Sequence, residues 1–157
     1  MKTKISTLFA FVLCIFSLNA SAIKLSKDAT ISILTCAPGN ELYSLFGHTG
    51  IRITDEANRL DIVFNYGTFD FETQGFYFKF AQGLLPYQLS CTDFDYFVRS
   101  YHREKRSVYS QTLNLDSIQK QYLMDLLVEN YQPQNRSYIY NFLYDNCSTR
   151  VRDIIEK

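Results

Sequence analysis

The sequence of 157 residues has no tryptophan, only two histidines, six glycines and three prolines, and no excess of charge of either sign. So little glycine and proline excludes collagen-like and low-complexity chains, and a hydrophobic content of 46% excludes a disordered one. The 16 basic and 16 acidic side chains cancel, so the composition lacks the basic excess of nucleic-acid-binding domains and we expect no nucleic-acid partner. A globular chain of this length predicts one domain.

A long apolar run lies at the N-terminus. Two lysines precede the run from Leu8 to Leu18, and the small residues Ala20 and Ala22 stand where a signal peptidase requires them. This pattern is typical of a cleaved Sec-type signal peptide, because the run is too short and wrongly flanked for a membrane-spanning helix. We therefore predict a signal peptide over residues 1–22, a domain over residues 23–157, and export to the periplasm.

Cysteine is also scarce. Cys14 leaves with the predicted signal peptide, and Cys36, Cys91 and Cys147 remain, an odd number for an oxidising compartment. The alternatives are one disulfide with one free thiol, or three free thiols; a bond between Cys36 and Cys91 would leave Cys147 free. No Cys-x-x-Cys pair occurs, so a zinc site is not expected, and the sequence indicates no metal and no cofactor.

The 12 tyrosines and 13 phenylalanines favour strands with large rings in a small core. Alternation of apolar and polar residues predicts strands over residues 30–36, 48–54, 60–66, 86–90 and 106–115. Helical spacing predicts helices over residues 73–85 (where a strand period also fits), 92–104, 117–131 and 148–156. Together these elements predict an α+β fold in which helices pack on a small antiparallel sheet.

Two of the predicted helices have clear start signals. Thr92 is the expected N-cap of the second helix (92–104), and Asp116 with Gln119 forms a capping box at the start of the third (117–131). The apolar stripe of the third helix predicts that Ile118 and Tyr122 face the core together with the leucines that follow.

Cys147 is the candidate nucleophile. It follows two residues that cap helices well and stands in the first turn of the last predicted helix, where free N–H groups and the helix dipole lower the pKa of a thiol. His48 opens a predicted strand between Gly47 and Thr49, and an imidazole is the usual base for a cysteine nucleophile. The alternative for both residues is a structural role, with Cys147 buried or in a disulfide.

A cysteine–histidine pair usually needs a polar group that orients the imidazole. Asn65 is the first candidate, because it lies on the neighbouring predicted strand, on the face opposite the bulky residues. Asp61 shares that face and is the second candidate. We expect Asp145 to act as a helix N-cap instead.

This order of residues resembles the circularly permuted papain-like hydrolases and acyltransferases, a group that includes permuted NlpC/P60 and lecithin:retinol-acyltransferase-like proteins. More specifically, the sequence resembles the Lnb N-terminal periplasmic domain of Bacteroidota. The most specific motifs are Phe-Gly-His at residues 46–48 and Asp-Asn-Cys-Ser-Thr-Arg at residues 145–150. The segments that carry the resemblance are residues 36–44, 46–52, 64–71 and 145–155.

The resemblance implies a permuted papain-like core and a part in the N-acylation of bacterial lipoproteins. An acyl chain would pass from a phospholipid to Cys147, with His48 as base, and then to the N-terminal amine of a lipoprotein. Asn65 as the orienting group is an inference from its position. The implied partners are a phospholipid donor, a lipoprotein acceptor and a membrane surface.

Members of this family carry a membrane-embedded part after this domain, and these 157 residues contain none. We therefore expect either a piece of a longer membrane protein or a stand-alone relative with a different substrate. Two other functions are kept as alternatives. One is a cysteine peptidase or amidase that acts on cell-wall peptides, with water as the acceptor. The other is a non-catalytic binding module of the cell envelope.

Overall fold

The computed structural model describes residues 23–69 and 72–157, so the predicted signal peptide lies outside the described residues. Its strands are β1 (Thr30–Cys36), β2 (His48–Asp55), β3 (Leu60–Thr68), β4 (Pro86–Asp93), β5 (Val108–Thr112) and β6 (Ser137–Ile139). Its α-helices are α1 (Phe76–Ala81), α2 (Phe94–Arg103), α3 (Ser117–Tyr131) and α4 (Cys147–Ile155). Two short 3₁₀ turns, η1 (Leu42–Ser44) and η2 (Glu56–Asn58), flank β2.

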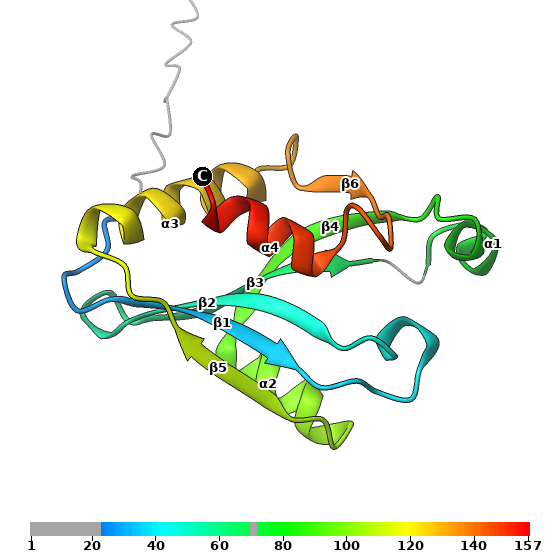
Figure 1. Ribbon diagram of the computed structural model, residues 1–157, viewed down its shortest axis with the longest axis horizontal. Coiled ribbons are helices and arrows are strands. Elements are labelled where there is room, and N and C mark those ends of the chain that lie inside the picture. Colours follow the sequence, from blue (N-terminus) through cyan, green and yellow to red (C-terminus); the bar gives the residue numbers. More distant parts are fainter. Residues whose placement is uncertain (1–22, 70–71) are drawn as a thin grey trace, which may run out of the picture.

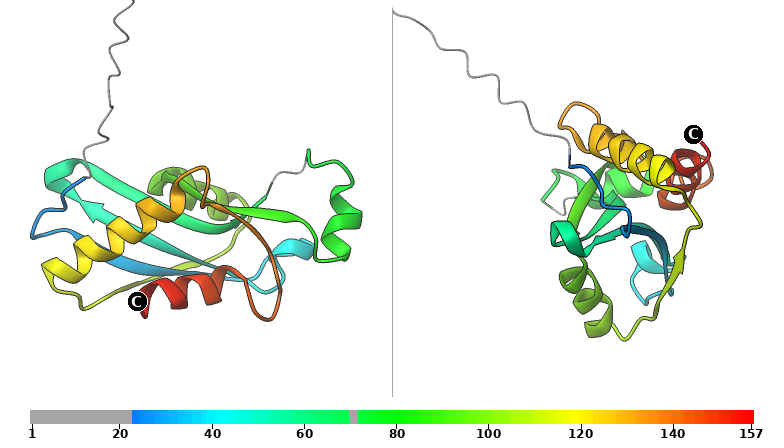
Figure 2. Two further views of the ribbon diagram at one scale, coloured as in Figure 1. Left: turned by 90° about the horizontal axis from the view of Figure 1, so that it is seen from above. Right: turned by 90° about the vertical axis from the view of Figure 1, so that its left-hand side faces the viewer.

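The six strands form one antiparallel sheet in the order β5-β1-β2-β3-β4-β6 (Figure 1). The α3 and α4 helices lie on one face of this sheet and α2 lies on the other, as the end-on view in Figure 2 shows. The prediction of an α+β fold built on an antiparallel sheet is therefore confirmed. No α-helix in the described ranges is long and apolar enough to cross a membrane.

Strand alternation divides the core into two clusters. Ile31, Ile51 and Ile53 point toward α3 and α4, where Leu127 and Ile154 meet them. Leu34 and Val63 point the other way and pack against Phe97 of α2 with its neighbours. Burying one such aliphatic side chain stabilises the fold by about 1.5–3 kcal/mol, so both helix layers are held to the sheet by these contacts.

The start of α3 agrees with the sequence prediction, whereas the start of α2 differs from it. Asp116 caps α3 through the N–H groups of Ile118 and Gln119, and the expected capping box is present. Thr92, however, lies inside β4, and the α2 cap is Asp93, which accepts hydrogen bonds from Asp95 and Tyr96. The prediction was wrong by one residue because β4 pairs with β3 as far as Asp93.

The buried side of α3 also differs from the predicted stripe. Leu123, Met124 and Leu127 are buried, whereas Ile118 is 81% exposed and Tyr122 is 52% exposed. The residues of the first turn, 117–119, are all exposed, and the buried residues of α3 begin at Leu123. Predicted burial was therefore wrong for Ile118 and Tyr122.

Asp55 fastens the segment before β1 to the end of β2. Its carboxylate is 1% exposed and accepts hydrogen bonds from the Ser26 N–H at 2.7 Å, the Ser26 hydroxyl at 2.7 Å and the Asn58 amide at 2.7 Å. Burial raises the pKa of Asp55, but these hydrogen bonds outweigh it and hold the pKa at about 2. The charged carboxylate therefore stabilises the folded chain.

We expect Asp55→Asn to lower the free energy of unfolding by about 1.5–3 kcal/mol at pH 7, because the amide nitrogen faces donors instead of accepting from them. The folded-state pKa lies below the ordinary value, so this contribution is present above about pH 4 and is lost as the pH falls toward 2. Urea unfolding at several pH values measures it. The exposed Asp153, which pairs with Arg152, provides the control, and Asp153→Asn should change stability by less than about 0.5 kcal/mol. A pH-independent difference between Asp55→Asn and the wild type would contradict the prediction.

Candidate active site

The site forms where β2 and β3 separate. Their pairing runs from Asp55–Leu60 to Ile51–Phe64, and the residues beyond, His48 on β2 and Asn65 on β3, lie outside this pairing. A shift in the register between β3 and β4 falls at residues 65–68 and includes Gly67, whose φ is +94°. Such a bulge redirects the side chains around it and is frequent beside active sites. The first turn of α4 packs against this opening.

The loop before α4 places Cys147 at the first helical position. Asn146 is the N-cap, and its side chain accepts hydrogen bonds from the N–H groups of Ser148 at 2.9 Å and Thr149 at 3.0 Å. Asp145, the expected cap, instead binds Arg150 with two hydrogen bonds of 2.6 and 2.8 Å. The expected role of Asp145 was wrong, because its backbone pairs with Asn141 and leaves capping to the next residue.

His48, the first residue of β2, is held in position by the conformation of Gly47 before it and by a hydrogen bond to Asn65 of β3. Gly47 before it has a φ of +74°, and a Cβ on Gly47 would stand 2.6 Å from the carbonyl oxygen of Cys36. Glycine is therefore required in the Phe-Gly-His motif. The imidazole Nε2 of His48 donates a hydrogen bond to Oδ1 of Asn65. With Nε2 protonated, the neutral ring leaves Nδ1 free to accept a proton from the thiol.

The structure brings together the three residues predicted for the site, Cys147, His48 and Asn65. Asp61, the second candidate for the orienting group, lies elsewhere: it holds Arg52 through two hydrogen bonds of 2.7 Å. Asn65 is thus the orienting partner of the imidazole in this structure. The catalytic roles of the three residues stay predictions.

The surroundings of Cys147 favour its thiolate. Burial raises the pKa of Cys147, but it is outweighed by a hydrogen bond and the charge of His48, by the backbone N–H of Thr49, and by the Ser148 hydroxyl, so that the pKa is lowered to about 7. Thr49 and Ser148 are also joined to each other, Oγ1 to Oγ, at 3.0 Å. Sequence reasoning did not single out these two residues, although both are direct neighbours of the predicted pair.

The other two cysteines of the described residues, Cys36 and Cys91, are free thiols whose pKa values are raised rather than lowered. Cys36 packs in the cluster under α2, whereas Cys91 packs on the opposite side of the sheet with the α3 and α4 cluster. Burial raises the pKa of each thiol to about 11. All three cysteines of residues 23–157 are therefore free thiols, and the sheet separates Cys36 from Cys91, the pair that the sequence left as a possible disulfide.

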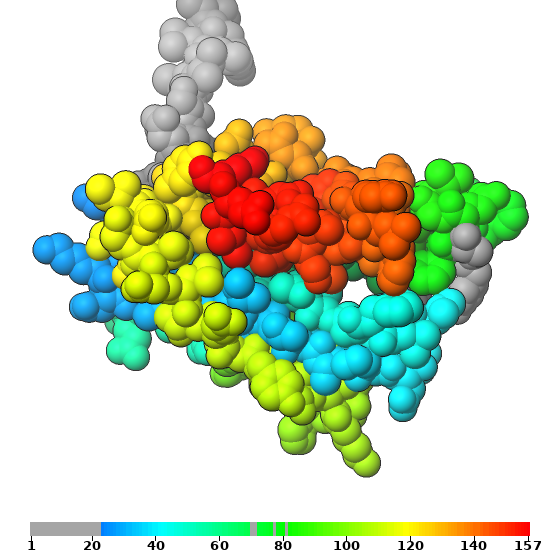
Figure 3. All heavy atoms as spheres, viewed as in Figure 1, coloured from blue at the N-terminus to red at the C-terminus, as the bar shows by residue number. Residues whose placement is uncertain are grey.

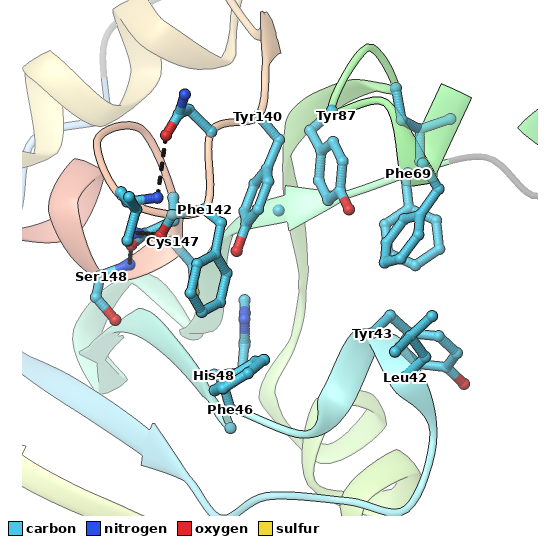
Figure 4. A pocket seen from close by; sticks show the side chains of 18 of the residues that line it. Leu42, Tyr43, Phe46, His48, Phe69, Tyr87, Tyr140, Phe142, Cys147 and Ser148 are labelled. Atoms are coloured by element: carbon cyan, nitrogen blue, oxygen red, sulfur yellow. Dashed lines mark hydrogen bonds between the residues drawn. The ribbon is translucent and has the colours of Figure 1, made fainter. Parts of the chain in front are cut away.

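A cleft of about 800 Å³ opens beside Cys147 and His48. Figure 4 shows Tyr140 and Tyr87 on one side of it and Phe46, Leu42 and Tyr43 on the other. The apolar residues that line it are Leu42, Tyr43, Phe46, Phe69, Phe80, Leu85, Tyr87, Tyr140, Phe142 and Leu143. In Figure 3 a hollow is visible where the orange segment before α4 meets the cyan segment before β2.

The mouth of the cleft is exposed and apolar. Phe46 is 76% exposed and Leu143 is 68% exposed, and both line the cleft. Phe46 meets Phe142 edge to face across the cleft, with ring centroids 4.6 Å apart. The aromatic abundance of the sequence is therefore concentrated partly at this site, a placement that composition alone did not indicate.

Fold and site define an α+β domain with a cysteine–histidine pair at the end of an aromatic cleft. The sequence matches the family described as Lnb N-terminal periplasmic domain over residues 21–157. The chain belongs to this family, as the sequence motifs implied, and is therefore a periplasmic domain. No curated protein and no solved structure matches it.

We expect the Cys147 thiol to be alkylated by iodoacetamide with a pH midpoint near 7, because its pKa is lowered to about 7. Above this midpoint the thiolate predominates, and below it the reaction slows tenfold per pH unit. His48→Ala should move the midpoint to higher pH, since it removes the hydrogen bond and the charge that contribute most to lowering the pKa of Cys147. Mass analysis of labelled peptides measures each site separately.

Cys36 and Cys91 are internal controls, and both should stay unlabelled at pH 7 because their pKa values are about 11. His102 on α2 offers a matched histidine control, and His102→Ala should leave the midpoint unchanged. An unshifted midpoint in His48→Ala would show that the imidazole does not activate Cys147.

Proposed function

We propose that this domain is a thiol acyltransferase that moves an acyl chain from a phospholipid to Cys147, as a thioester, and then to the N-terminal amine of a bacterial lipoprotein. The observation that carries the proposal is the arrangement of Cys147, His48 and Asn65 at the end of an aromatic cleft. The family to which the chain belongs supports a periplasmic setting.

The cysteine–histidine pair supports covalent catalysis. A thiol with a pKa of about 7 is about half ionised at pH 7, and its thiolate attacks an ester carbonyl directly. His48, oriented by Asn65, then gives its proton to the departing alcohol. When an amine attacks the thioester, His48 takes the proton of the amine and returns it to the sulfur as the amide forms.

The cleft supports a lipid substrate over a polar one. Its volume of about 800 Å³ falls in the range of about 300–1,000 Å³ that is usual for small-ligand sites. Its walls are built mainly of aromatic and aliphatic side chains, which favour a hydrocarbon chain by removing it from water. The exposed Phe46 and Leu143 at its mouth would meet the acyl region of a membrane surface.

The order of the site residues along the chain supports the finer fold assignment. His48 opens β2, Asn65 follows on β3, and Cys147 opens the last helix, which is the order of circularly permuted papain-like enzymes. We infer a permuted papain-like core from this order and from the packing of α4 against β2 and β3.

The test uses purified protein with vesicles of a phospholipid that carries an alkyne-tagged acyl chain, and a diacylglyceryl-cysteinyl peptide as acceptor. We expect the tag on Cys147 in a bond that hydroxylamine cleaves, followed by its transfer to the peptide amine. Cys147→Ala should abolish both products, and His48→Ala should slow thioester formation by about 10²–10⁴-fold because the positioned base is lost. Gel fluorescence and mass analysis measure the products.

Cys91→Ala is the matched control, since Cys91 is a free thiol outside the cleft, and it should react like the wild type. Release of free fatty acid without peptide acylation would replace the proposal by a hydrolase. Cleavage of muropeptides with no thioester from lipid would favour the cell-wall amidase. Absence of every reaction, with Cys147 unreactive, would favour the binding module.

A further inference from the structure

A buried hydroxyl without a partner lies behind the candidate site. Tyr138 in β6 is 9% exposed, and within the described residues no hydrogen-bond partner is found for its buried Oη. Folded proteins rarely contain such a group, because an unpaired buried polar atom costs about 1–3 kcal/mol. A donor of this kind points to an acceptor that arrives with a ligand.

Gly67 marks the space that such an acceptor would fill. A Cβ placed on Gly67 would lie 3.6 Å from Cε1 of His48, 3.7 Å from Cβ of Cys147 and 3.9 Å from Oη of Tyr138. Gly67 also lines the cleft, so this hollow is continuous with the substrate space. The φ of +94° at Gly67 disfavours every other residue and so keeps the hollow free of a side chain.

This hollow is within reach of the oxygen of an acyl group on Cys147. In a thioester, or in the tetrahedral intermediate that precedes it, the oxygen is three bonds from Cβ of the cysteine. The separation of 3.7 Å between Cys147 Cβ and the hollow is within the reach of three bonds. The oxygen would therefore have His48 on one side and the Tyr138 hydroxyl on the other.

We propose that Tyr138 donates a hydrogen bond to the oxyanion formed when Cys147 is acylated, an inference that rests on the proposed acyl transfer. The Cys147 thiolate attacks the ester carbonyl carbon, the S–C bond forms, and the π electrons move to the oxygen beside Gly67. Tyr138 keeps its proton and stabilises this charge. The carbonyl then re-forms, the C–O bond to the alcohol breaks, and the alcohol leaves with the proton of the His48 imidazolium.

Neighbouring groups hold the Tyr138 ring in place. The Arg150 guanidinium lies 3.7 Å from the ring centroid and is itself fixed by Asp145. Tyr66 and Tyr87 contact the ring with centroids 6.5 and 6.2 Å away. Burial raises the pKa of Tyr138, which keeps the hydroxyl protonated as a donor. A fixed donor of this kind stabilises an oxyanion without reorganisation, and its hydrogen bond shortens when the reacting group arrives.

Tyr138→Phe tests the proposal because it removes only the hydroxyl. With p-nitrophenyl octanoate as acyl donor, we expect the burst of p-nitrophenol to slow about 10²-fold or more, the usual effect of losing one oxyanion donor. Alkylation of Cys147 by iodoacetamide should keep its rate and pH midpoint, since that reaction forms no oxyanion. Thermal unfolding should show equal or higher stability, because the unpaired hydroxyl is gone.

Tyr101→Phe is the matched control. Tyr101 lies on α2 across the sheet and its buried hydroxyl bonds Cys36, so the variant should lose stability and keep the wild-type burst rate. An equal burst rate in Tyr138→Phe and the wild type would overturn this proposal alone. An equal slowing of alkylation and acylation in Tyr138→Phe would also overturn it, because it would indicate that Tyr138 acts on the thiolate. A wild-type protein that no ester acylates, while Cys147 still reacts with iodoacetamide, would overturn the proposed acyl transfer together with this inference.

Discussion

The hydrogen bonds made to Cys147 at the point where α4 meets the sheet are the interaction on which the candidate site depends. Burial alone would raise the pKa of this thiol, as it does for Cys36 and Cys91. At Cys147 this effect of burial on the pKa is outweighed by His48, the Thr49 N–H and the Ser148 hydroxyl. The described residues thus carry two thiols with raised pKa values and one with a lowered pKa, and the difference is in their neighbours rather than in their burial.

Those neighbours are available only because the sheet opens at the right place. β2 and β3 pair up to Ile51 and Phe64, and beyond this point the side chain of His48 meets Asn65 instead of continuing a regular ladder. The bulge at residues 65–68 places Gly67 between His48 and Cys147. The irregular part of the sheet and the first turn of α4 thus meet at the candidate site.

The apolar walls of the cleft strengthen the effect of the polar residues around Cys147. Aromatic walls exclude water from one side of the thiol, which strengthens the electrostatic effect of each nearby donor. The segments before β2 and before α4 supply both parts, since each ends at a site residue, His48 or Cys147, and contributes Phe46 or Phe142 to the cleft. The shape of the cleft and the activation of the thiol therefore depend on the same two segments.

Features with local causes could be predicted from the amino-acid sequence. Alternation placed β1, β2 and β3 nearly to the residue, the capping box placed the start of α3, and the motifs around His48 and Cys147 identified the family and two of the site residues. It also named Asn65, because alternation assigns a strand residue to one face. Asp61 remained an equal member of that face until the structure paired it with Arg52.

Features that depend on contacts between distant segments could be seen only in the folded protein. β4 reaches Asp93 because β3 pairs with it that far, and the exposure of Ile118 depends on which turns of α3 pack on the rest of the fold. The register shift at Gly67, the free state of Cys36 and Cys91, and the unpaired hydroxyl of Tyr138 likewise involve residues far apart in the chain. Periodicity reports which face a residue occupies, but only packing decides what lies opposite that face.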